Sequence, residues 1–429
     1  MIEVEFLHRL PPARLAAILT RSAAAPAGFK AAAAEILARL TSDPEGELRR
    51  EYGTLKPRLT PADFKVSAEE IEAAHRDLPA EVLAALRKAA AAIHKFHAAQ
   101  LERPSWFEEF APGLLAGRLT RPLERVGVYI PGGRAAYPSS ALMNIIPAKA
   151  AGVSEIIAAS PPGPDFTIRP ETLVAAHLAG AEAIYKLGGA WAVGCLAHGL
   201  AGLPRVDKIV GPGSAWVTAA KLAVFGQVDI DLPAGPSEGF IIADGQAPAE
   251  WLAWDLLAQL EHDPLAAAVL VSVDEGLARR VAAEIGRLFP GLDRRDIVGE
   301  ALKNGAAILV AESLDEAFDF ANLYAPEHLQ LVLAEPLSHL ARVRHAGSVF
   351  LGSHAPIAAG DYASGPNHVL PTGGAARMFS GLSVDSFLKK ITFQHLTREA
   401  LKDILPAAAA LARAEGLTAH ARSLEIRHP

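Results

Sequence analysis

Cysteine is almost absent from this chain: Cys195 is the one cysteine among 429 residues. A single thiol excludes an intrachain disulfide framework and any metal cluster built on several thiolates. Aldehyde-oxidising enzymes often use a cysteine nucleophile, but the apolar segment Ala190–Ala197 around Cys195 contains no histidine or carboxylate that could activate a thiolate. We therefore expect Cys195 to be a packing residue.

An excess of positive charge is also missing. The formal net charge is −7, so no basic field favours binding to nucleic acid or to an anionic membrane. No apolar run approaches the roughly 20 residues of a membrane helix, and residues 1–10 lack the pattern of a signal peptide. The length and the 51% of hydrophobic residues are typical of an ordered globular protein of about two or three domains. We expect a cytoplasmic enzyme without nucleic-acid or membrane partners.

The ordinary dinucleotide motif, Gly-x-Gly-x-x-Gly after a first strand, is missing as well. Tyr129 to Gly133 stands in its place, and a glycine pair after a strand lets backbone N–H groups approach a phosphate closely. Gly211–Gly213 and Ala234–Glu238 are two further tight loops. Each alone is equally typical of a simple turn, but ligands of open α/β sheets bind where strands end, which favours the three loops together.

The order of the elements predicts an α/β protein. Residues 1 to about 120 have a helical pattern, in which the stretch Val66–Leu101 opens with an N-cap pattern at Ser67. From about Arg125 onward, short apolar runs alternate with alanine-rich helical segments, which indicates two domains with parallel sheets. The expected strands are Val126–Ile130, Glu155–Ala158, Ala183–Tyr185, Lys208–Val210, Phe240–Ala243, Ala267–Ser272, Ala307–Val310, Gln330–Leu333 and Ser348–Leu351. The chain from about Ser383 onward is expected to be helical again.

Two polar clusters carry the chemistry. Tyr324 to His328 places Glu327 beside His328, and a histidine near neutrality can take a proton while its neighbouring carboxylate orients it or activates water. About thirty residues later, Gly360 to His368 adds Asp361 as a candidate metal ligand and His368 as a donor. Such a loop can also be merely solvated, but two clusters of this kind favour an active site.

Gln259 and His262 form a third candidate group. On a helix these residues lie about 60° apart around the axis, so they share one face and can reach one ion. Imidazole and oxygen ligands suit a divalent metal such as zinc. Alone, the pair is more typical of an exposed helix end, and the tail segment Glu415–His420 is more typical of solvated charge.

Nearly the whole chain resembles the histidinol dehydrogenase family. The matching segments are Val66–Leu101, Arg125–Gly133, Val206–Lys221, Ala234–Asp244, Asp255–His262, Asn322–Leu329, Gly347–Thr372 and Glu415–His420. The resemblance implies an intertwined homodimer of two incomplete Rossmann-like domains with small helical flanking domains. It divides the chain into residues 1–23, a metal-binding and catalytic domain of residues 24–128 and 238–382, a cofactor-side domain of residues 129–237, and a tail of residues 383–429 that reaches the partner subunit.

The same resemblance implies the reaction and the site. L-histidinol is oxidised to L-histidine in two NAD-dependent steps through a bound aldehyde, which completes histidine biosynthesis, with His328 as the base and Glu327 activating water. One zinc ion per subunit would orient the substrate. The implied zinc ligands, which also contact the substrate, are Gln259, His262, Asp361 and His420, the last expected to serve the partner's site. The other implied substrate contacts are Ser237, Glu327, His328, His368 and Glu415, and the implied cofactor contacts are Tyr129, Trp191 and Ser214.

The chain departs from the family at two of these cofactor positions. Trp191 stands where the family usually has Gln, and Ser214 stands where it usually has Asn. An indole cannot copy an amide, although its ring could stack on a base or a ribose. This departure leaves open a paralogous zinc- and NAD-dependent dehydrogenase of another small alcohol, such as a sulfonated diol. A zinc hydrolase that needs no NAD and a non-catalytic dimer are further alternatives.

Overall fold

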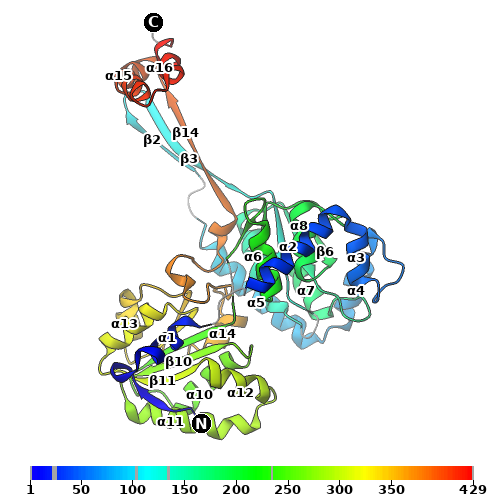
Figure 1. Ribbon diagram of the computed structural model, residues 1–429, viewed down its shortest axis with the longest axis vertical. Coiled ribbons are helices and arrows are strands. Elements are labelled where there is room, and N and C mark those ends of the chain that lie inside the picture. The colour runs from blue at the N-terminus through cyan, green and yellow to red at the C-terminus, as the bar shows by residue number, and fades with distance from the viewer. Residues whose placement is uncertain (1, 22–26, 102–104, 133–135, 233–234, 428–429) are drawn as a thin grey trace. The chain divides into compact units, whose positions relative to one another are not determined.

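The computed structural model describes residues 2–21, 27–101, 105–132, 136–232 and 235–427 (Figure 1). The chain forms two compact units. Unit 1 comprises Met1–Gln100 and Glu124–Ser386, and unit 2 comprises Leu101–Leu123 and Phe387–Pro429. None of the described helices is both long and apolar enough to cross a membrane.

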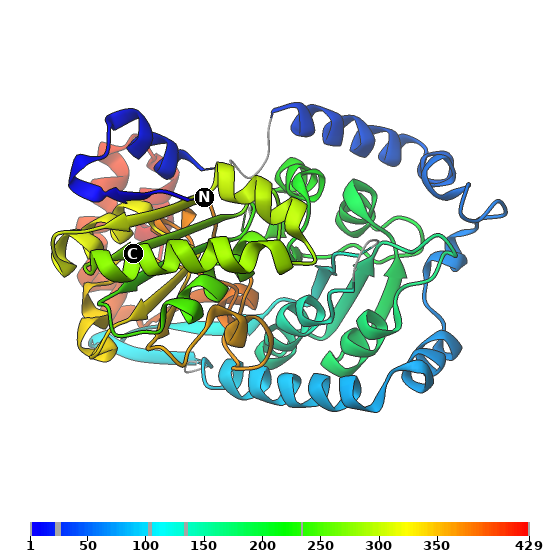
Figure 2. The same ribbon diagram turned by 90° about the horizontal axis from the view of Figure 1, so that it is seen from below.

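Five parallel strands form one sheet of unit 1, in the order β6-β5-β4-β7-β8. They are β4 (Arg125–Tyr129), β5 (Glu155–Ser160), β6 (Ala183–Lys186), β7 (Lys208–Val210) and β8 (Asp229–Ile230), connected by α6 (Pro138–Ala151), α7 (Pro170–Ala179), α8 (Gly189–His198) and α9 (Ala215–Val224). These strands are short apolar runs because helices cover both faces of the sheet. Helices α2 (Ala27–Ser42) and α5 (Ala80–Ala98) form outer layers on opposite sides, α2 against α8 and α9 and α5 against α6 and α7 (Figure 2).

Six parallel strands form the other sheet of unit 1, in the order β1-β11-β10-β9-β12-β13. They are β1 (Val4–Phe6), β9 (Glu238–Ala243), β10 (Ala267–Ser272), β11 (Ala306–Val310), β12 (His328–Val332) and β13 (Ser348–Leu351). Helices α10 (Ala249–Leu260), α11 (Glu275–Leu288) and α12 (Arg295–Asn304) bury one face of the sheet. Helices α1 (Pro12–Thr20) and α13 (Leu314–Tyr324) bury the other, around Phe240, Phe320 and Tyr324.

Apart from the edge strand β1, the two sheets share one strand order. In the first sheet, β4, β5 and β6 run outward on one side and β7 and β8 on the other; β9, β10 and β11 with β12 and β13 repeat this arrangement in the second. Each sheet therefore has one point where the order reverses, between β4 and β7 and between β9 and β12. The sequence shows no internal repeat by inspection, so the similarity of the halves is structural.

Unit 2 is a three-stranded antiparallel sheet with two helices. Its strands are β2 (Ser105–Ala111), β3 (Leu114–Pro122) and β14 (Leu388–Leu396), in the order β14-β3-β2, and its helices are α15 (Arg398–Ala414) and α16 (Thr418–Glu425) (Figure 1). The expectation of helix throughout residues 1 to 120 and from Ser383 onward was wrong for these strands. Strand β3 pairs with β14 more than 260 residues later along its whole length, and a partner so distant leaves no local periodicity in the sequence.

The remaining expectations about elements were largely confirmed. All nine expected strands are present, with ends that shift by at most two residues. The short strands β1 and β8 were not expected. The long helical stretch is two helices, α4 (Ala68–Asp77) and α5, because Pro79 interrupts it; Ser67 accepts from the Glu70 N–H as the N-cap pattern predicts. Helix α3 (Pro44–Tyr52) completes the N-terminal part.

Candidate active site

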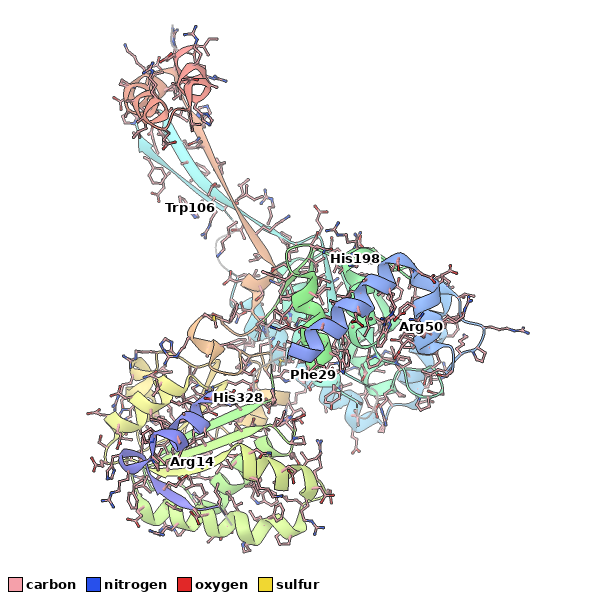
Figure 3. All side chains as sticks on the ribbon, viewed as in Figure 1. Arg14, Phe29, Arg50, Trp106, His198 and His328 are labelled. Atoms are coloured by element: carbon pink, nitrogen blue, oxygen red, sulfur yellow. The ribbon has the colours of Figure 1, made fainter. Side chains whose placement is uncertain are left out.

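The candidate catalytic pair lies at the amino end of the six-stranded sheet. His328 is the first residue of β12, directly after Glu327, and Glu238 is the first residue of the neighbouring β9, directly after Ser237. His328 pairs with Gly239 across the two strands (Figure 3 labels His328). The 234–238 loop follows β8 of the five-stranded sheet and precedes β9, so in the six-stranded sheet it lies at an amino end. Ala234 itself lies outside the described residues.

The backbone of Glu238 holds both catalytic candidates. The Nδ1–H of His328 donates to the Glu238 carbonyl oxygen at 3.0 Å, and the Glu238 N–H donates to Glu327 Oε2 at 2.7 Å. Glu327 Oε2 is also 3.4 Å from His328 Nδ1. Because Nδ1 carries the proton that the carbonyl accepts, Nε2 is the atom of His328 that gains or loses a proton. Nε2 is buried and has no hydrogen-bond partner among the described residues.

Asp361 faces this free ring nitrogen. Its Oδ1 is 3.6 Å from His328 Nε2, and its side chain is 16% exposed. Asp361 belongs to the short helix α14 (Ile357–Tyr362), and its carbonyl oxygen lies 2.8 Å from His368 Nδ1. The two candidate residues of the Gly360–His368 cluster therefore lie side by side.

Gln259 and His262 approach from the end of α10. This helix follows β9 and runs back along the sheet, which brings its C-terminal residues to the amino ends of the strands. Gln259 is 1% exposed, and its Oε1 has no hydrogen-bond partner in the described part of the chain. An orphaned buried carbonyl oxygen fits a metal ligand, because burying it unpaired otherwise costs about 1–3 kcal/mol.

The charges of the site are coupled. Burial lowers the pKa of His328, but the carboxylates of Glu327 and Asp361 outweigh that effect and raise it. Burial raises the pKa of Glu327, against the opposing charge of His328. Burial also tends to raise the pKa of Asp361, but the contact and charge of His328 lower it overall. Burial lowers the pKa of His262 and His368, although Asp361 acts against it. The pKa shifts of His262, His368 and Asp361 therefore favour two neutral imidazoles beside an anionic carboxylate, which is a donor set for a divalent cation.

Three structural supports of this site were not predicted from the sequence. Arg21 forms a buried ion pair with Glu238. Asn367, directly before His368, lies within 3.2 Å of His97 Nε2 and donates to the Met143 carbonyl oxygen at 2.6 Å. Gly239 leaves room for Gln259. A histidine in a predicted helix and a glycine inside a strand can be seen in the sequence, but their partners are distant in sequence.

Glu415 and His420 lie in unit 2. Glu415 caps the C-terminus of α15, and His420 is in the first turn of α16; both side chains are exposed. The roles of these two residues toward the residues of unit 1 stay predictions.

The candidate cofactor loops lie at the carboxyl end of the five-stranded sheet. The loops after β4 and β7 flank the point where the strand order reverses, which is where open α/β sheets bind ligands. Tyr129, the last residue of β4, accepts the Gly189 N–H at 3.3 Å, and Tyr52 accepts the Gly188 N–H at 2.8 Å. Two phenol groups thus hold the glycine turn that begins α8. Gly133 lies outside the described residues.

The second glycine loop is held by a buried ion pair. Asp231 accepts the Gly211 N–H at 2.7 Å and pairs with Lys221, whose Nζ donates to the Gly211 carbonyl oxygen at 3.0 Å. Gly211 has φ +117°, and a Cβ there would lie 2.0 Å from the Tyr129 carbonyl oxygen. Only glycine fits this close approach of the loops after β4 and β7.

The two departures from the family pattern occupy different surroundings. The indole N–H of Trp191 donates to Glu47 Oε1 at 3.2 Å, and the ring packs against the buried core beside the five-stranded sheet. Ser214 is the exposed N-cap residue of α9, and its side chain makes no cap hydrogen bond. A cavity of about 360 Å³ opens beside Gly132, between the loop after β5 and the start of α7, and Ser160 and Arg169 are among its lining residues.

Two other groups bear on alternative chemistry. Cys195 is buried, and burial raises its pKa to about 12, which confirms a packing residue rather than a thiolate nucleophile. Among the described residues, His8, Glu312 and Glu316 are the three potential metal ligands whose atoms gather within 4.8 Å of one another. They lie near the edge strand β1. The predicted zinc set, by contrast, offers only one histidine and one carboxylate from unit 1.

Comparisons with known proteins agree with the resemblance. A model of the histidinol dehydrogenase family matches residues 20–428. The histidinol dehydrogenase of Heliobacterium mobile is 52% identical over 366 residues, 85% of each chain. That of Methanothermobacter thermautotrophicus is 48% identical over 395 residues, 92% of each chain. The crystal structure of histidinol dehydrogenase from Elizabethkingia anophelis, 36% identical, superposes with a TM-score of 0.92 and covers 100% of this chain and 97% of that one. This chain belongs to the histidinol dehydrogenase family.

Proposed function

We propose that this oxidoreductase is a zinc-dependent L-histidinol dehydrogenase that forms L-histidine in two NAD-dependent steps through a bound aldehyde. One observation carries the proposal. Glu327, His328, Asp361 and Gln259 converge at the amino ends of β9 and β12, where His328 Nε2 and Gln259 Oε1 are buried and have no hydrogen-bond partner among the described residues. Buried polar atoms left unpaired in this way favour a site that a substrate and a metal complete.

His328 acts as the base. Its Nδ1–H is committed to the Glu238 carbonyl oxygen, so Nε2 removes the hydroxyl proton as hydride leaves for NAD. In the chain alone, the neighbouring carboxylates raise the pKa of His328. A divalent cation held by Asp361 would remove part of this bias toward the imidazolium, and its own positive charge would lower the pKa of His328.

Glu327 acts in the second oxidation. The aldehyde must gain the oxygen of a water molecule before it can lose a second hydride, and a carboxylate beside the base can take the proton of that water. Burial raises the pKa of Glu327, which makes this carboxylate a stronger base than an exposed one. Its position is fixed by the Glu238 N–H.

Zinc fits the donor set of Gln259, His262 and Asp361, with His420 from the partner subunit as the fourth ligand. When bound, the ion would hold the imidazole and amine of the substrate as a template. Ser237, His368 and Glu415 complete the substrate contacts. Ser237 directly precedes the residue that holds the catalytic pair, and His368 is held by the carbonyl oxygen of Asp361.

NAD binds at the carboxyl end of the five-stranded sheet, with contacts from Tyr129, Trp191 and Ser214. The reversal of strand order between β4 and β7 supports this location. Because its N–H already donates to Glu47, Trp191 offers the cofactor its ring surface rather than a hydrogen bond.

The assembly is a homodimer with intertwined subunits and shared sites. Unit 2 exposes large apolar side chains, including Phe107, Phe110, Leu411 and Ile426, and such residues in number favour burial against a partner. The four-part division at residues 23, 128, 237 and 382 and the cytoplasmic location belong to the same proposal. Residue 23 lies outside the described part of the chain.

The decisive measurement is NADH formed per L-histidinol consumed by the zinc-loaded protein, repeated after chelation and after return of zinc. Two NADH per histidinol, lost on chelation and restored by zinc, would establish the complete reaction and its metal dependence. An absence of turnover in a zinc-bound dimer would favour a paralogue that oxidises another small alcohol, for which Trp191 and Ser214 are the motivating differences. Ester hydrolysis without nicotinamide would instead favour a zinc hydrolase.

A further inference from the structure

Apart from a 3.5 Å contact with the Leu19 carbonyl oxygen of α1, the side chain of Arg21 bonds to the segments that hold the catalytic pair. Arg21 follows α1, and its side chain is 7% exposed. Its Nε and Nη2 donate to the two carboxylate oxygens of Glu238 at 2.9 and 2.7 Å. Nη1 donates to the Tyr324 carbonyl oxygen at 2.8 Å, and Nη2 lies 3.3 Å from the Ala325 carbonyl oxygen. The guanidinium carbon stands 3.5 Å from the centre of the Tyr324 ring.

These contacts join the two segments that carry the site. Glu238 opens β9, and its backbone N–H and carbonyl oxygen hold Glu327 and His328. Tyr324 and Ala325 form the turn that leads into Glu327, and Ala325 has φ +51°, a conformation that residues with a side chain rarely adopt. Arg21 therefore holds the catalytic residues from both sides, through β9 and through the turn before β12.

Arg21 also balances charge at this point. Glu238 and Glu327 are both buried, and they lie close together because the backbone N–H of Glu238 donates to the carboxylate of Glu327. A buried carboxylate requires a partner charge, and Arg21 supplies it in a bidentate pair. The Gly373 N–H adds a third donor to Glu238 Oε1 at 2.6 Å.

We propose that Arg21 is a positioning residue for the catalytic pair: through Glu238 and the Tyr324–Ala325 turn it holds Glu327 and His328 in their reactive geometry. This role rests on the proposed function for its kinetic consequence, but the geometric consequence does not depend on any substrate. A misplacement of about 1 Å at reacting groups costs on the order of 100-fold in rate.

The test compares Arg21→Met, Arg21→Lys and Arg14→Met in the zinc-loaded full-length protein. Arg14 in α1 makes a similar bidentate pair with Glu5, from Nε to Oε1 at 3.2 Å and from Nη2 to Oε2 at 2.9 Å. Glu5 lies in β1, which β11 and β10 separate from β9. We expect Arg21→Met to lower kcat about 100-fold with KM for L-histidinol and zinc content nearly unchanged. Lysine should recover part of kcat, and Arg14→Met should keep it.

A crystal structure of Arg21→Met provides the readout that is independent of turnover. We expect the hydrogen bond of His328 to Glu238 to be lengthened or lost and the turn before Glu327 to be displaced. Unchanged positions of Glu327 and His328, or a kcat within about twofold of the wild type in a folded variant, would overturn the role. A wild-type protein without histidinol turnover would instead refute the proposed function, and the crystal structure would still decide the positioning role. If Arg21→Met does not fold, the double variant Arg21→Met/Glu238→Gln removes both buried charges and takes its place in both measurements.

Discussion

Gly239 lies directly beneath Gln259: a Cβ at Gly239 would stand 2.6 Å from Gln259 Cγ, closer than real side-chain carbons approach. Gly239 is also paired with His328 in the sheet. The missing side chain thus allows the end of α10 to approach the strand that neighbours the catalytic histidine, and Gln259 occupies the space.

Replacing Gly239 with alanine should displace Gln259. Because Gln259 is a proposed zinc ligand, we expect zinc affinity to fall about 10- to 100-fold, as it does when a support of a ligand is lost. Competition with a chromophoric chelator measures the change. Gly291→Ala is the matched control, because nothing lies within 4 Å of a Cβ there. Equal zinc affinity in the two variants would remove Gln259 from the ligand set.

Mixed dimers test the shared site. His328→Gln and His420→Ala subunits should each be inactive alone, but a heterodimer joins an intact His328 with an intact His420 at one of its two sites. After random reassociation we expect about a quarter of the wild-type activity. Activity and zinc content of the mixture, measured against each variant alone, check this outcome. No recovery in a mixture with proven subunit exchange would show that both residues serve the same subunit's site.

Glu327→Gln should separate the two oxidations. The amide keeps the shape of the side chain but cannot take the proton of water, so aldehyde oxidation should fall on the order of 100-fold and alcohol oxidation by less than about tenfold. Single-turnover NADH formation from L-histidinol and from the aldehyde distinguishes the steps. Equal losses in both would leave Glu327 only an orienting role toward His328.

His97 should make the fold sensitive to acid. Burial lowers its pKa, and its neutral ring lies between the Ile93 carbonyl oxygen at 2.8 Å and Asn367 at 3.2 Å. The unfolded chain binds the proton more readily, so stability is complete above the unfolded pKa of about 6.5 and falls as the pH drops below it. Denaturant titrations between about pH 7 and 5 measure this slope.

In His97→Gln, the free energy of unfolding should depend less steeply on pH. Because the substitution is at a buried hydrogen-bonded site, it should also cost about 1–3 kcal/mol of stability at neutral pH. His94→Gln on the exposed side of the same helix is the control and should retain the slope. An unchanged slope in His97→Gln would assign the acid sensitivity to the other buried histidines, such as His368.

The local pattern of residues was sufficient for much of the fold. Runs such as Ala267–Ser272 are typical of strands that are buried on both faces, and Ser67 begins a helix because its side chain and Glu70 cap it. The motifs around Glu327 and Asp361 are long enough to identify the family from the sequence, and the family comparison confirms it. These features depend on residues that are neighbours in the chain.

Contacts between distant segments were decided only by the tertiary structure. The pairing of β3 with β14, the clamp of Arg21 on Glu238 and the space that Gly239 leaves for Gln259 join residues that are 20 to more than 260 positions apart. The sequence of a parallel strand does not indicate which strands pair with it. Neither the strand order of the two sheets nor the location of the catalytic pair at the amino ends of β9 and β12 could therefore be predicted. Burial and the approach of unlike charges, which shift the pKa values of Glu327 and His328, exist only once these segments meet.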